Sequence, residues 1–171
     1  MNASSSNVIH FGFTDSSLGV VAVARSTKGV CAILLADDRR ELLREMRQQF
    51  PDAELVEDAQ GLASTLAGVA RFVESPALGI DLPLDVGGTA FQQRVWRALR
   101  KIPRGTTASY ADIARKIDAP KSVRAVAQAC GANRLALVIP CHRVVRSDGA
   151  LSGYRWGVTR KRALLEREAA R

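Results

Sequence analysis

The stretch SYADIARKIDAPKSVRAVAQACGA, residues 109–132, predicts two short helices joined by a turn. Ser109 and Asp112 form a capping box that opens the first helix, because each side chain can satisfy a backbone N–H that the helix end leaves free. Asp118-Ala119-Pro120 suits the turn, and the second helix follows over 121–132. Helix, turn and helix form the pattern of the helix-turn-helix motif, although many helix pairs in protein cores have the same spacing.

The second helix of this pair has a predicted buried face and a predicted exposed face. At helical spacing, the buried side chains are Val123, Val126, Ala127 and Cys130. On the other face Arg124 and Gln128 lie one turn apart, with small alanines beside the arginine. Small side chains would let the backbone approach a duplex closely. We therefore predict that this helix binds DNA through Ser122, Arg124, Ala125, Gln128 and Ala129.

Charge is divided unevenly along the chain. The 171 residues carry a net charge of +8, yet residues 1–86 hold 7 Lys and Arg against 12 Asp and Glu, whereas residues 87–171 hold 18 against 5. A local excess of cations supplies sequence-independent affinity for nucleic acid, because neutralised phosphates release counterions. A merely solvated basic surface is the alternative. The large difference in charge between the two halves favours nucleic-acid binding by the C-terminal half.

Composition also restricts the class of protein. Hydrophobic residues make up 47% of the chain, which is enough to bury a core. No apolar run approaches the roughly 20 residues that span a bilayer, and the first seven residues lack the features of a signal peptide. The three cysteines, at positions 31, 130 and 141, are odd in number and widely spaced, so reduced thiols are expected. We predict a cytoplasmic protein with no membrane partner, associated with the nucleoid when it is bound to DNA.

The N-terminal half is predicted to form a small α+β scaffold. An antiparallel meander is indicated by three runs rich in strand-forming residues, 8–13, 18–25 and 29–35. Apolar residues at helical spacing predict helices over 39–50 and 62–73. Cys31 falls in the third strand, where a small buried hydrophobic residue is the favoured interpretation.

A segment containing prolines and glycines, residues 75–88, separates the two halves and coincides with the change in charge. We place the boundary near 85–87. This predicts a scaffold domain over 1–86 and a DNA-binding domain over 87–171.

Three further elements are predicted in the C-terminal half. Thr89 and Gln92 form another capping box, which opens a core helix. The Asp-Gly turn within 146–149 predicts a hairpin or wing. The last helix is predicted to start at Thr159 and has cations at 160–162 in its first turn. Because the helix dipole disfavours cations there, either water or a bound phosphate should compensate them.

The candidate reactive thiol of the chain follows an apolar run. Residues 135–139 predict a buried strand that leads through Pro140 into Cys141 and His142. A nucleophilic thiol needs a base, because an ordinary thiol is mostly protonated at neutral pH, and His142 is the candidate. Neighbouring residues of a strand point to opposite faces, so contact between the two would need a turn or a bridging water. An inert buried cysteine is the alternative, and zinc is a poor one because no suitable ligand spacing exists.

Here the sequence resembles a known family. The run IPCHRVV at 139–145 is similar to that of the methylated-DNA protein-cysteine methyltransferases, also called O6-alkylguanine-DNA alkyltransferases. The same resemblance extends to Arg124, Asn133, Gly153, Tyr154 and Glu168.

The resemblance is close over residues 82–171. At 89–93 and 151–157 it is strongest toward the C-terminal part of the bacterial adaptive-response (Ada) members of the family. It implies an α/β (α+β) fold, in which an N-terminal ribonuclease-H-like antiparallel sheet with helices precedes a C-terminal winged helix-turn-helix-like helical domain.

The family resemblance also implies roles for the site residues. Cys141 would accept the alkyl group from O6 of guanine, or from O4 of methylated thymine, in one step and never be regenerated. His142 would deprotonate it through a water, with Glu168 orienting the imidazole. Asn133 would brace the turn at the site and Tyr110 would protonate the leaving guanine. The base would lie among the carbonyls of Cys141 and Val144, the N–H of Arg155, and the side chains of Tyr154, Trp156 and Lys161.

The resemblance also implies that the partner is duplex DNA containing O6-alkylguanine and that no cofactor is needed. The single-site chemistry requires only a monomer. O6 lies within a stacked base pair, so the nucleotide must flip out, and Arg124 would take its place. The second helix would enter the minor groove, although helix-turn-helix proteins generally use the major groove. Trp156 stands where some relatives carry a small residue, which predicts a pocket that favours methyl over benzyl adducts. The cysteine cluster of the adaptive-response zinc domain is missing, so no metal and no phosphotriester repair are predicted.

Two other functions are alternatives to the predicted alkyl transfer. A winged helix-turn-helix protein could bind alkylated DNA without reacting, but Cys141 argues against it. A cysteine hydrolase that uses His142 would lack an oxyanion-hole motif and would have no need of a DNA-binding unit.

Overall fold

The computed structural model describes residues 7–170 and has a four-stranded sheet in its N-terminal half. Strands β1 (Val8–Ser16), β2 (Gly19–Arg25) and β3 (Val30–Ala36) pair antiparallel, which confirms the predicted meander. A fourth strand, β4 (Glu54–Glu57), pairs parallel with β1 and completes the order β3-β2-β1-β4. This short edge strand was not predicted, because four residues with exposed ends carry little pattern.

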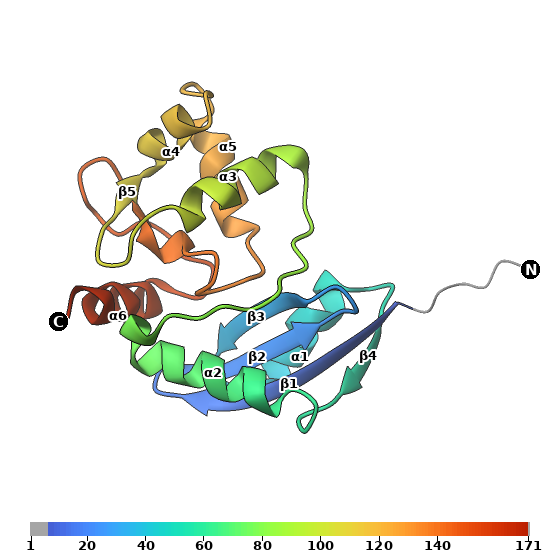
Figure 1. The fold of residues 1–171 in the computed structure, drawn as a ribbon. Coiled ribbons are helices and arrows are strands. Elements are labelled where there is room, and N and C mark those ends of the chain that lie inside the picture. Colours follow the sequence, from blue (N-terminus) through green and yellow to red (C-terminus); the bar gives the residue numbers. More distant parts are fainter. Residues whose placement is uncertain (1–6, 171) are drawn as a thin grey trace, which may run out of the picture.

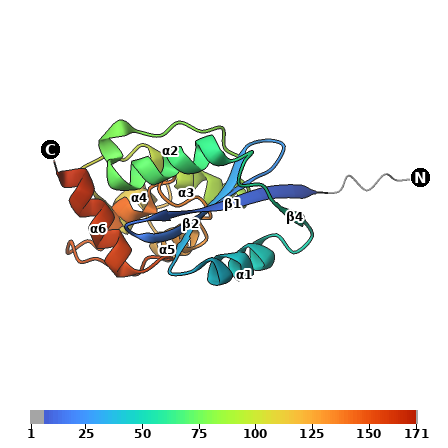
Figure 2. The same cartoon turned by 90° about the horizontal axis from the view of Figure 1, so that it is seen from below.

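Two helices cover the sheet. Helix α1 (Arg39–Gln49) begins at Asp38, whose side chain accepts from the N–H of Glu41. Helix α2 (Ala63–Glu74) lies on the opposite face of the sheet from α1 (Figure 2). Both helices confirm the predicted ones to within a residue, and together with the strands they confirm the α+β fold.

The outer strand β3 is unusual because all of its residues are buried. Its free edge is covered by part of the segment 75–88, which bonds to Val30, and by the segment before Cys141. The N–H of Ile33 donates to the carbonyl of Arg134 at 2.8 Å, and the carbonyl of Ile33 accepts from the N–H of Ala136 at 3.0 Å. The sheet edge therefore holds in place the backbone that leads to Cys141.

The C-terminal half is mostly helical and lies above the sheet (Figure 1). After the short 3-10 turn η1 (Pro76–Leu78), its elements in order are α3 (Ala90–Arg100), β5 (Ala108–Ser109), α4 (Tyr110–Lys116), α5 (Val123–Gly131), η2 (Cys141–Arg143), β6 (Val144–Val145) and α6 (Val158–Ala169). Helices α4 and α5 form the predicted helix pair. The capping boxes at Thr89 and Ser109 are both present, as predicted. The division into domains 1–86 and 87–171 stays a prediction. Within residues 7–170, no helix combines the length and apolarity that a membrane crossing requires.

The run 135–139 is not a strand, so this prediction is wrong. Only an isolated bridge joins Leu135 to β3, and the N–H of Ile139 folds back onto the carbonyl of Leu135 at 3.0 Å. Leu137 has a positive φ of 75°, which the extended conformation excludes. The chain therefore turns tightly before Cys141, which begins the 3-10 turn η2 rather than following a strand.

The predicted hairpin is also only partly correct. A turn is present, since Arg146 N–H donates to the carbonyl of Ala150 at 3.0 Å, but residues 150–151 form no strand. Strand β6 pairs instead with β5, in parallel. The pairing joins the start of the helix pair to the segment after Cys141.

Helix α6 starts at Val158, and Arg160 in its first turn is compensated by acceptors of the protein itself. The Arg160 guanidinium donates to the carbonyls of Leu18 at 2.6 Å and Trp156 at 3.0 Å, and pairs with Asp37 at 2.6 Å. Lys161 is fully buried. For Arg160 the prediction of an external compensating group is wrong, because α6 packs against the sheet half, which supplies acceptors. Arg162 is exposed, and for it the prediction stays a prediction.

Candidate active site

Cys141 lies at the start of η2 with only 4% of its surface exposed. Asn133 holds this segment in shape. Its Nδ2 donates to the carbonyl of Ile139 at 2.9 Å and to the Cys141 Sγ at 3.3 Å, while its Oδ1 accepts from the N–H of Leu135 at 2.9 Å. One buried amide thus spans the turn and contacts the thiol.

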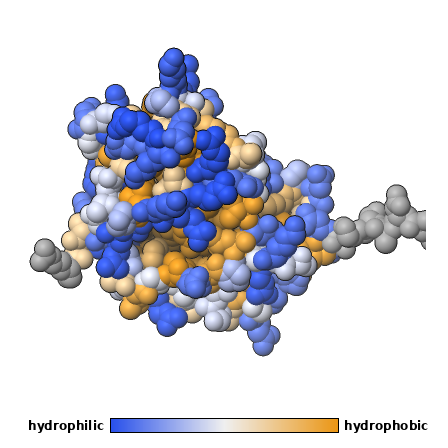
Figure 3. Space-filling model, turned by 45° about the horizontal axis from the view of Figure 1, so that its top comes forward, coloured by the Kyte–Doolittle hydropathy of each residue, from blue (hydrophilic) through white to orange (hydrophobic). Residues whose placement is uncertain are grey.

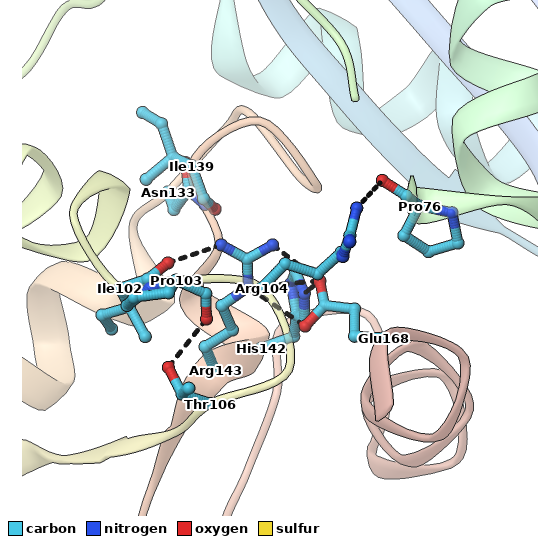
Figure 4. A network of polar contacts seen from close by, with 10 residues as sticks. All are labelled: Pro76, Ile102, Pro103, Arg104, Thr106, Asn133, Ile139, His142, Arg143 and Glu168. Atoms are coloured by element: carbon cyan, nitrogen blue, oxygen red, sulfur yellow. Dashed lines mark hydrogen bonds and ion pairs between the residues drawn. The ribbon is translucent and has the colours of Figure 1, made fainter. Parts of the chain in front are cut away.

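His142, Arg143 and Glu168 form a buried polar network (Figure 4). The Nε2 of His142 lies 2.7 Å from Oε1 of Glu168. Arg143 donates from Nη2 to Oε1 at 2.8 Å and from Nε to Oε2 at 3.0 Å, and its Nη1 donates to the carbonyl of Ile102 at 2.7 Å. Sequence reasoning singled out His142 and Glu168 but missed Arg143. The only signal available was that this arginine falls within the IPCHRVV run.

The network fixes the protonation of the imidazole. Burial by itself would raise the pKa of the Glu168 carboxyl, but hydrogen bonds from His142 and Arg143 outweigh it and lower the pKa to about 2. An ionised carboxylate only accepts, so His142 donates from Nε2 and its Nδ1 carries the lone pair. That Nδ1 is buried and has no hydrogen-bond partner among the described residues. It is the atom of the site that can take a proton.

The thiol of Cys141 is protonated at rest. Burial raises its pKa to about 11, against opposing effects from the Asn133 hydrogen bond and the charge of Lys161. Burial also lowers the pKa of His142, with Glu168 acting in the opposite direction. The resting pair is therefore a neutral thiol and a neutral imidazole. No hydrogen bond joins the two side chains among those the structure records over residues 7–170, which leaves a bridging water as the predicted path.

A cavity of about 460 Å³ opens beside the thiol. Its walls include Cys141, Tyr110, Tyr154 and Arg155. The hydroxyl of Tyr110 lies 2.8 Å from that of Ser152 on the same wall. A second cavity, of about 500 Å³, lies between the halves but does not reach Cys141. The smaller cavity is the candidate substrate pocket.

The other predicted pocket residues are arranged around this cavity. Val144, Trp156 and Lys161 are buried and do not line it. The ring of Trp156 packs edge-on against that of Tyr154, with 5.3 Å between centroids. Arg155 lines the cavity, but its guanidinium is turned to Glu45 on α1. Within residues 7–170, no group of three His, Cys, Asp or Glu side chains is placed to hold a metal ion.

The predicted DNA-binding helix is α5, and Arg124 and Gln128 are exposed on it as predicted, with Ser122 and Ala125 half-buried. The prediction for Ala129 is wrong, because it is only 2% exposed. Conversely, Val123 and Ala127 were predicted to be buried and are exposed. Residues Val126, Ala129 and Cys130 of α5 form the buried face, although the set predicted from spacing fits a helix equally well. Packing against α3 decides between the two sets, because the carbonyl of Ala129 accepts from Trp96 Nε1 at 2.9 Å. The surface over this half is largely hydrophilic (Figure 3).

Known proteins resemble this chain in sequence. Residues 90–170 match the family model described as 6-O-methylguanine DNA methyltransferase, DNA binding domain. The chain is 51% identical, over 94% of its length, to the bifunctional transcriptional activator/DNA repair enzyme Ada of Escherichia coli strain K12, and covers 46% of that protein. It thus spans about half the length of that relative. The inducible methylated-DNA–protein-cysteine methyltransferase of Bacillus subtilis strain 168 is 42% identical over 75% of this chain and 72% of its own length.

Solved structures share the fold. The crystal structure of Mycobacterium tuberculosis OGT in complex with DNA has a TM-score of 0.79 and 35% sequence identity, covering 94% of this chain and 92% of its own. The O6-methylguanine methyltransferase of the same organism has a TM-score of 0.75 and 36% identity, covering 94% of this chain and 93% of its own. The likeness covers both halves of the chain.

Proposed function

The chain belongs to the family of methylated-DNA–protein-cysteine methyltransferases, and we propose that it repairs duplex DNA by moving the alkyl group of O6-alkylguanine, or of O4-methylthymine, onto Cys141. One observation carries this proposal. The thiol of Cys141 lies on the pocket wall, and the next residue is the buried His142. The imidazole of His142 is bound to Glu168 through Nε2, and its Nδ1 has no partner among the described residues. An acceptor, a base and an orienting group are therefore assembled at one cavity.

Activation of the thiol begins with loss of its proton. The proton passes through a water to Nδ1 of His142, which becomes an imidazolium. Glu168 stabilises that charge because its carboxylate is already ionised and bound to Nε2. Arg143 keeps the carboxylate ionised and in place. The Asn133 amide stays within hydrogen-bond distance of the sulfur and favours the thiolate.

In the transfer step, Sγ of Cys141 attacks the alkyl carbon and the bond from that carbon to O6 breaks. The electron pair of the broken bond goes to the guanine, which receives a proton at N3 from Tyr110. The carbonyls of Cys141 and Val144 accept from the exocyclic amine, and the N–H of Arg155 meets O6. The alkylated Cys141 is a thioether, which has no S–H proton for His142 to remove and cannot form a thiolate again. Each protein molecule therefore repairs one base.

DNA recognition follows from the exposed side of α5. A base whose O6 lies inside the stack must leave the duplex before a buried thiol can reach it, at a cost of a few kcal/mol. Arg124 is exposed one turn before Ala127, which lines the pocket, and we expect the arginine to fill the vacated position. The small exposed Ala127 and half-buried Ala125 suit a close approach in the minor groove. Gln128 and Ser122 add polar contacts.

The acceptor, its base and the pocket all come from one chain, so a monomer is the proposed acting unit. No step calls for a cofactor or a metal. The three cysteines are free thiols, which suits a reducing compartment such as the cytoplasm.

The test is an intact mass measurement after incubation with duplex DNA that contains O6-methylguanine. We expect one added methyl group, mapped to Cys141 and absent from Cys141→Ala. Cys130→Ala is the matched control, because Cys130 lines the same cavity but has no adjacent base, and it should still be methylated. An unchanged mass with tight binding would instead identify a binder of alkylated DNA that does not react.

A further inference from the structure

We propose that Glu45, on α1 of the N-terminal half, is a positioning residue that sets the alkyl-size selectivity of the pocket through Arg155. This inference rests on the proposed function. It assigns a role in the reaction to a half of the chain that contributes no residue to the acceptor or its base. The contacts of Arg155 carry the argument.

Arg155 and Glu45 form a tight ion pair between the two halves. Oε1 of Glu45 accepts from Nη2 of Arg155 at 2.7 Å and from Nε at 3.1 Å. Only 14% of the arginine side chain and 23% of the glutamate side chain are exposed, so solvent screens this pair less than a surface pair. Two donors on one acceptor also fix the direction of the planar guanidinium. Arg155 is therefore held in one orientation.

The same guanidinium reaches the acceptor site. Its Nη1 donates to the backbone carbonyl of Asn133 at 2.7 Å, and the side chain of Asn133 donates to the Cys141 Sγ at 3.3 Å. Arg155 itself lines the cavity beside the thiol. Glu45 is thus two contacts away from the residue that braces the sulfur.

Aromatic packing connects the Arg155–Glu45 ion pair to the pocket wall. Cζ of Arg155 lies 5.4 Å from the centroid of the Trp156 ring, and that ring packs against Tyr154, which lines the cavity. A guanidinium fixed by Glu45 therefore supports the Trp156 ring, which packs behind the wall residue Tyr154. A fixed wall suits a methyl adduct, whereas a released wall can make room for a benzyl adduct at the expense of methyl alignment.

Two other ion pairs between the halves do not reach the pocket. Arg160 with Asp37 and Arg167 with Glu74 both hold α6, and the side chains of Asp37 and Glu74 are 90% and 50% exposed. Among the described residues, Glu45 is the acidic side chain of the N-terminal half that pairs with a residue of the pocket wall. This contact distinguishes it from a merely structural ion pair.

The test uses the full chain and variants Glu45→Gln and Glu45→Ala. Single-turnover transfer rates are measured at saturating duplex, with O6-methylguanine and with O6-benzylguanine in the same sequence. We expect the methyl rate to fall about tenfold in Glu45→Gln, as for a small misplacement of a reacting group. The benzyl rate should fall less or rise, so that the benzyl-to-methyl ratio increases. The DNA dissociation constant should stay unchanged.

Glu41→Gln is the matched control. It removes the same charge from the same helix, and its exposed side chain makes no hydrogen bond or ion pair that the structure records within residues 7–170, so both rates should match those of the unchanged protein. In an Arg155→Met background, Glu45→Gln should have no further effect, because the two residues act as a pair. Thermal unfolding verifies that each variant is folded. If Glu45→Ala does not fold, the isosteric Glu45→Gln alone provides the test.

Three outcomes are distinguishable. A raised benzyl-to-methyl ratio confined to the Glu45 variants supports the inference. Equal ratios in Glu45→Gln and Glu41→Gln, or a proportional loss of both rates, overturn it while transfer by the unchanged protein still stands. If the unchanged protein transfers no methyl group, the proposed function fails first.

Discussion

Nε2 of His142 lies 2.7 Å from Oε1 of Glu168, and the two side chains are 0% and 1% exposed. A carboxylate so buried is stable only when it is paired, and Arg143 supplies the compensating charge at 2.8 Å. The imidazole itself can then remain neutral until it receives a proton. His142, Glu168 and Arg143 therefore act as one unit. Arg143 keeps the carboxylate of Glu168 ionised, and Glu168 fixes the tautomer of His142.

Replacing the acid should slow transfer. In Glu168→Gln the imidazolium loses its stabilising carboxylate, and we expect a fall in the single-turnover rate of about a hundredfold, the scale of a general acid–base contribution. Glu166→Gln, an exposed neighbour on α6, is the control and should react normally. A Glu168→Gln protein that is folded and equally fast would show that His142 does not act through the acid.

Acidification should destabilise the protein partly through this carboxylate. The pKa of Glu168 is lowered from 4.5 to about 2 in the folded state, so the unfolded chain binds the proton more readily. Its contribution to stability is present above pH 4.5 and is lost as the pH falls toward 2. The lowered pKa of His142 acts in the same direction below pH 6.5.

Urea unfolding at a series of pH values measures this effect. The free energy of unfolding of Glu168→Gln should fall less steeply between pH 4.5 and 2 than that of the unchanged protein. Other carboxylates with lowered pKa, such as Asp58 and Asp112, are present in both proteins and cancel in the difference. Parallel curves would contradict the assigned role of Glu168.

Arginine at position 143 should not be replaceable by lysine. An ammonium group cannot reproduce donation to both oxygens of Glu168 and to the carbonyl of Ile102 at once. We expect Arg143→Lys to lower the free energy of unfolding by about 2 kcal/mol, because a buried acceptor loses its partner. Chemical denaturation checks this, with Arg97→Lys, an exposed position on α3, expected to change it little.

Local patterns and family resemblance predicted different parts of this molecule. The capping boxes at Thr89 and Ser109 could be read from spacing, because both partners lie within one helical turn. His142 and Glu168 are 26 residues apart, and only the resemblance brought them together. Arg143 was missed because nothing local marks an arginine as buried.

Where tertiary packing decides, the sequence was ambiguous. The apolar run 135–139 suits a buried strand and a buried turn equally, and the contacts of Asn133 select the turn with its positive φ at Leu137. On α5, Ala127 and Ala129 both fit a helical stripe. Burial of Ala129 depends on Trp96, which lies in another helix.

The amide of Asn133 should control the acidity of the thiol. Asn133→Asp replaces the donor beside Sγ with a negative charge, which should raise the pKa of Cys141 beyond about 11 and slow alkylation by iodoacetamide at pH 8 to 9. Asn133→Ala removes the donor without adding charge and should lie between Asn133→Asp and the unchanged protein. Equal rates in all three would show that Asn133 braces the turn without acting on the sulfur.

Arg124 should matter for duplex substrates only. If it fills the space of the flipped nucleotide, Arg124→Ala should slow transfer from duplex O6-methylguanine, by up to the few kcal/mol that flipping costs. Transfer from the free O6-methylguanine base should be unchanged, because no stack has to be opened. Single-turnover assays with both substrates measure the difference.

Lys121→Ala separates this role from simple attraction to phosphate. Both variants remove one exposed cation near the start of α5, so both should reduce the salt dependence of DNA binding by about one counterion. Only Arg124→Ala should also lower the transfer rate at saturating duplex, since a phosphate contact affects how much DNA is bound and not whether the bound base is extruded. Equal effects of the two substitutions on that rate would mean that Arg124 acts as a surface charge and that another residue holds the stack open.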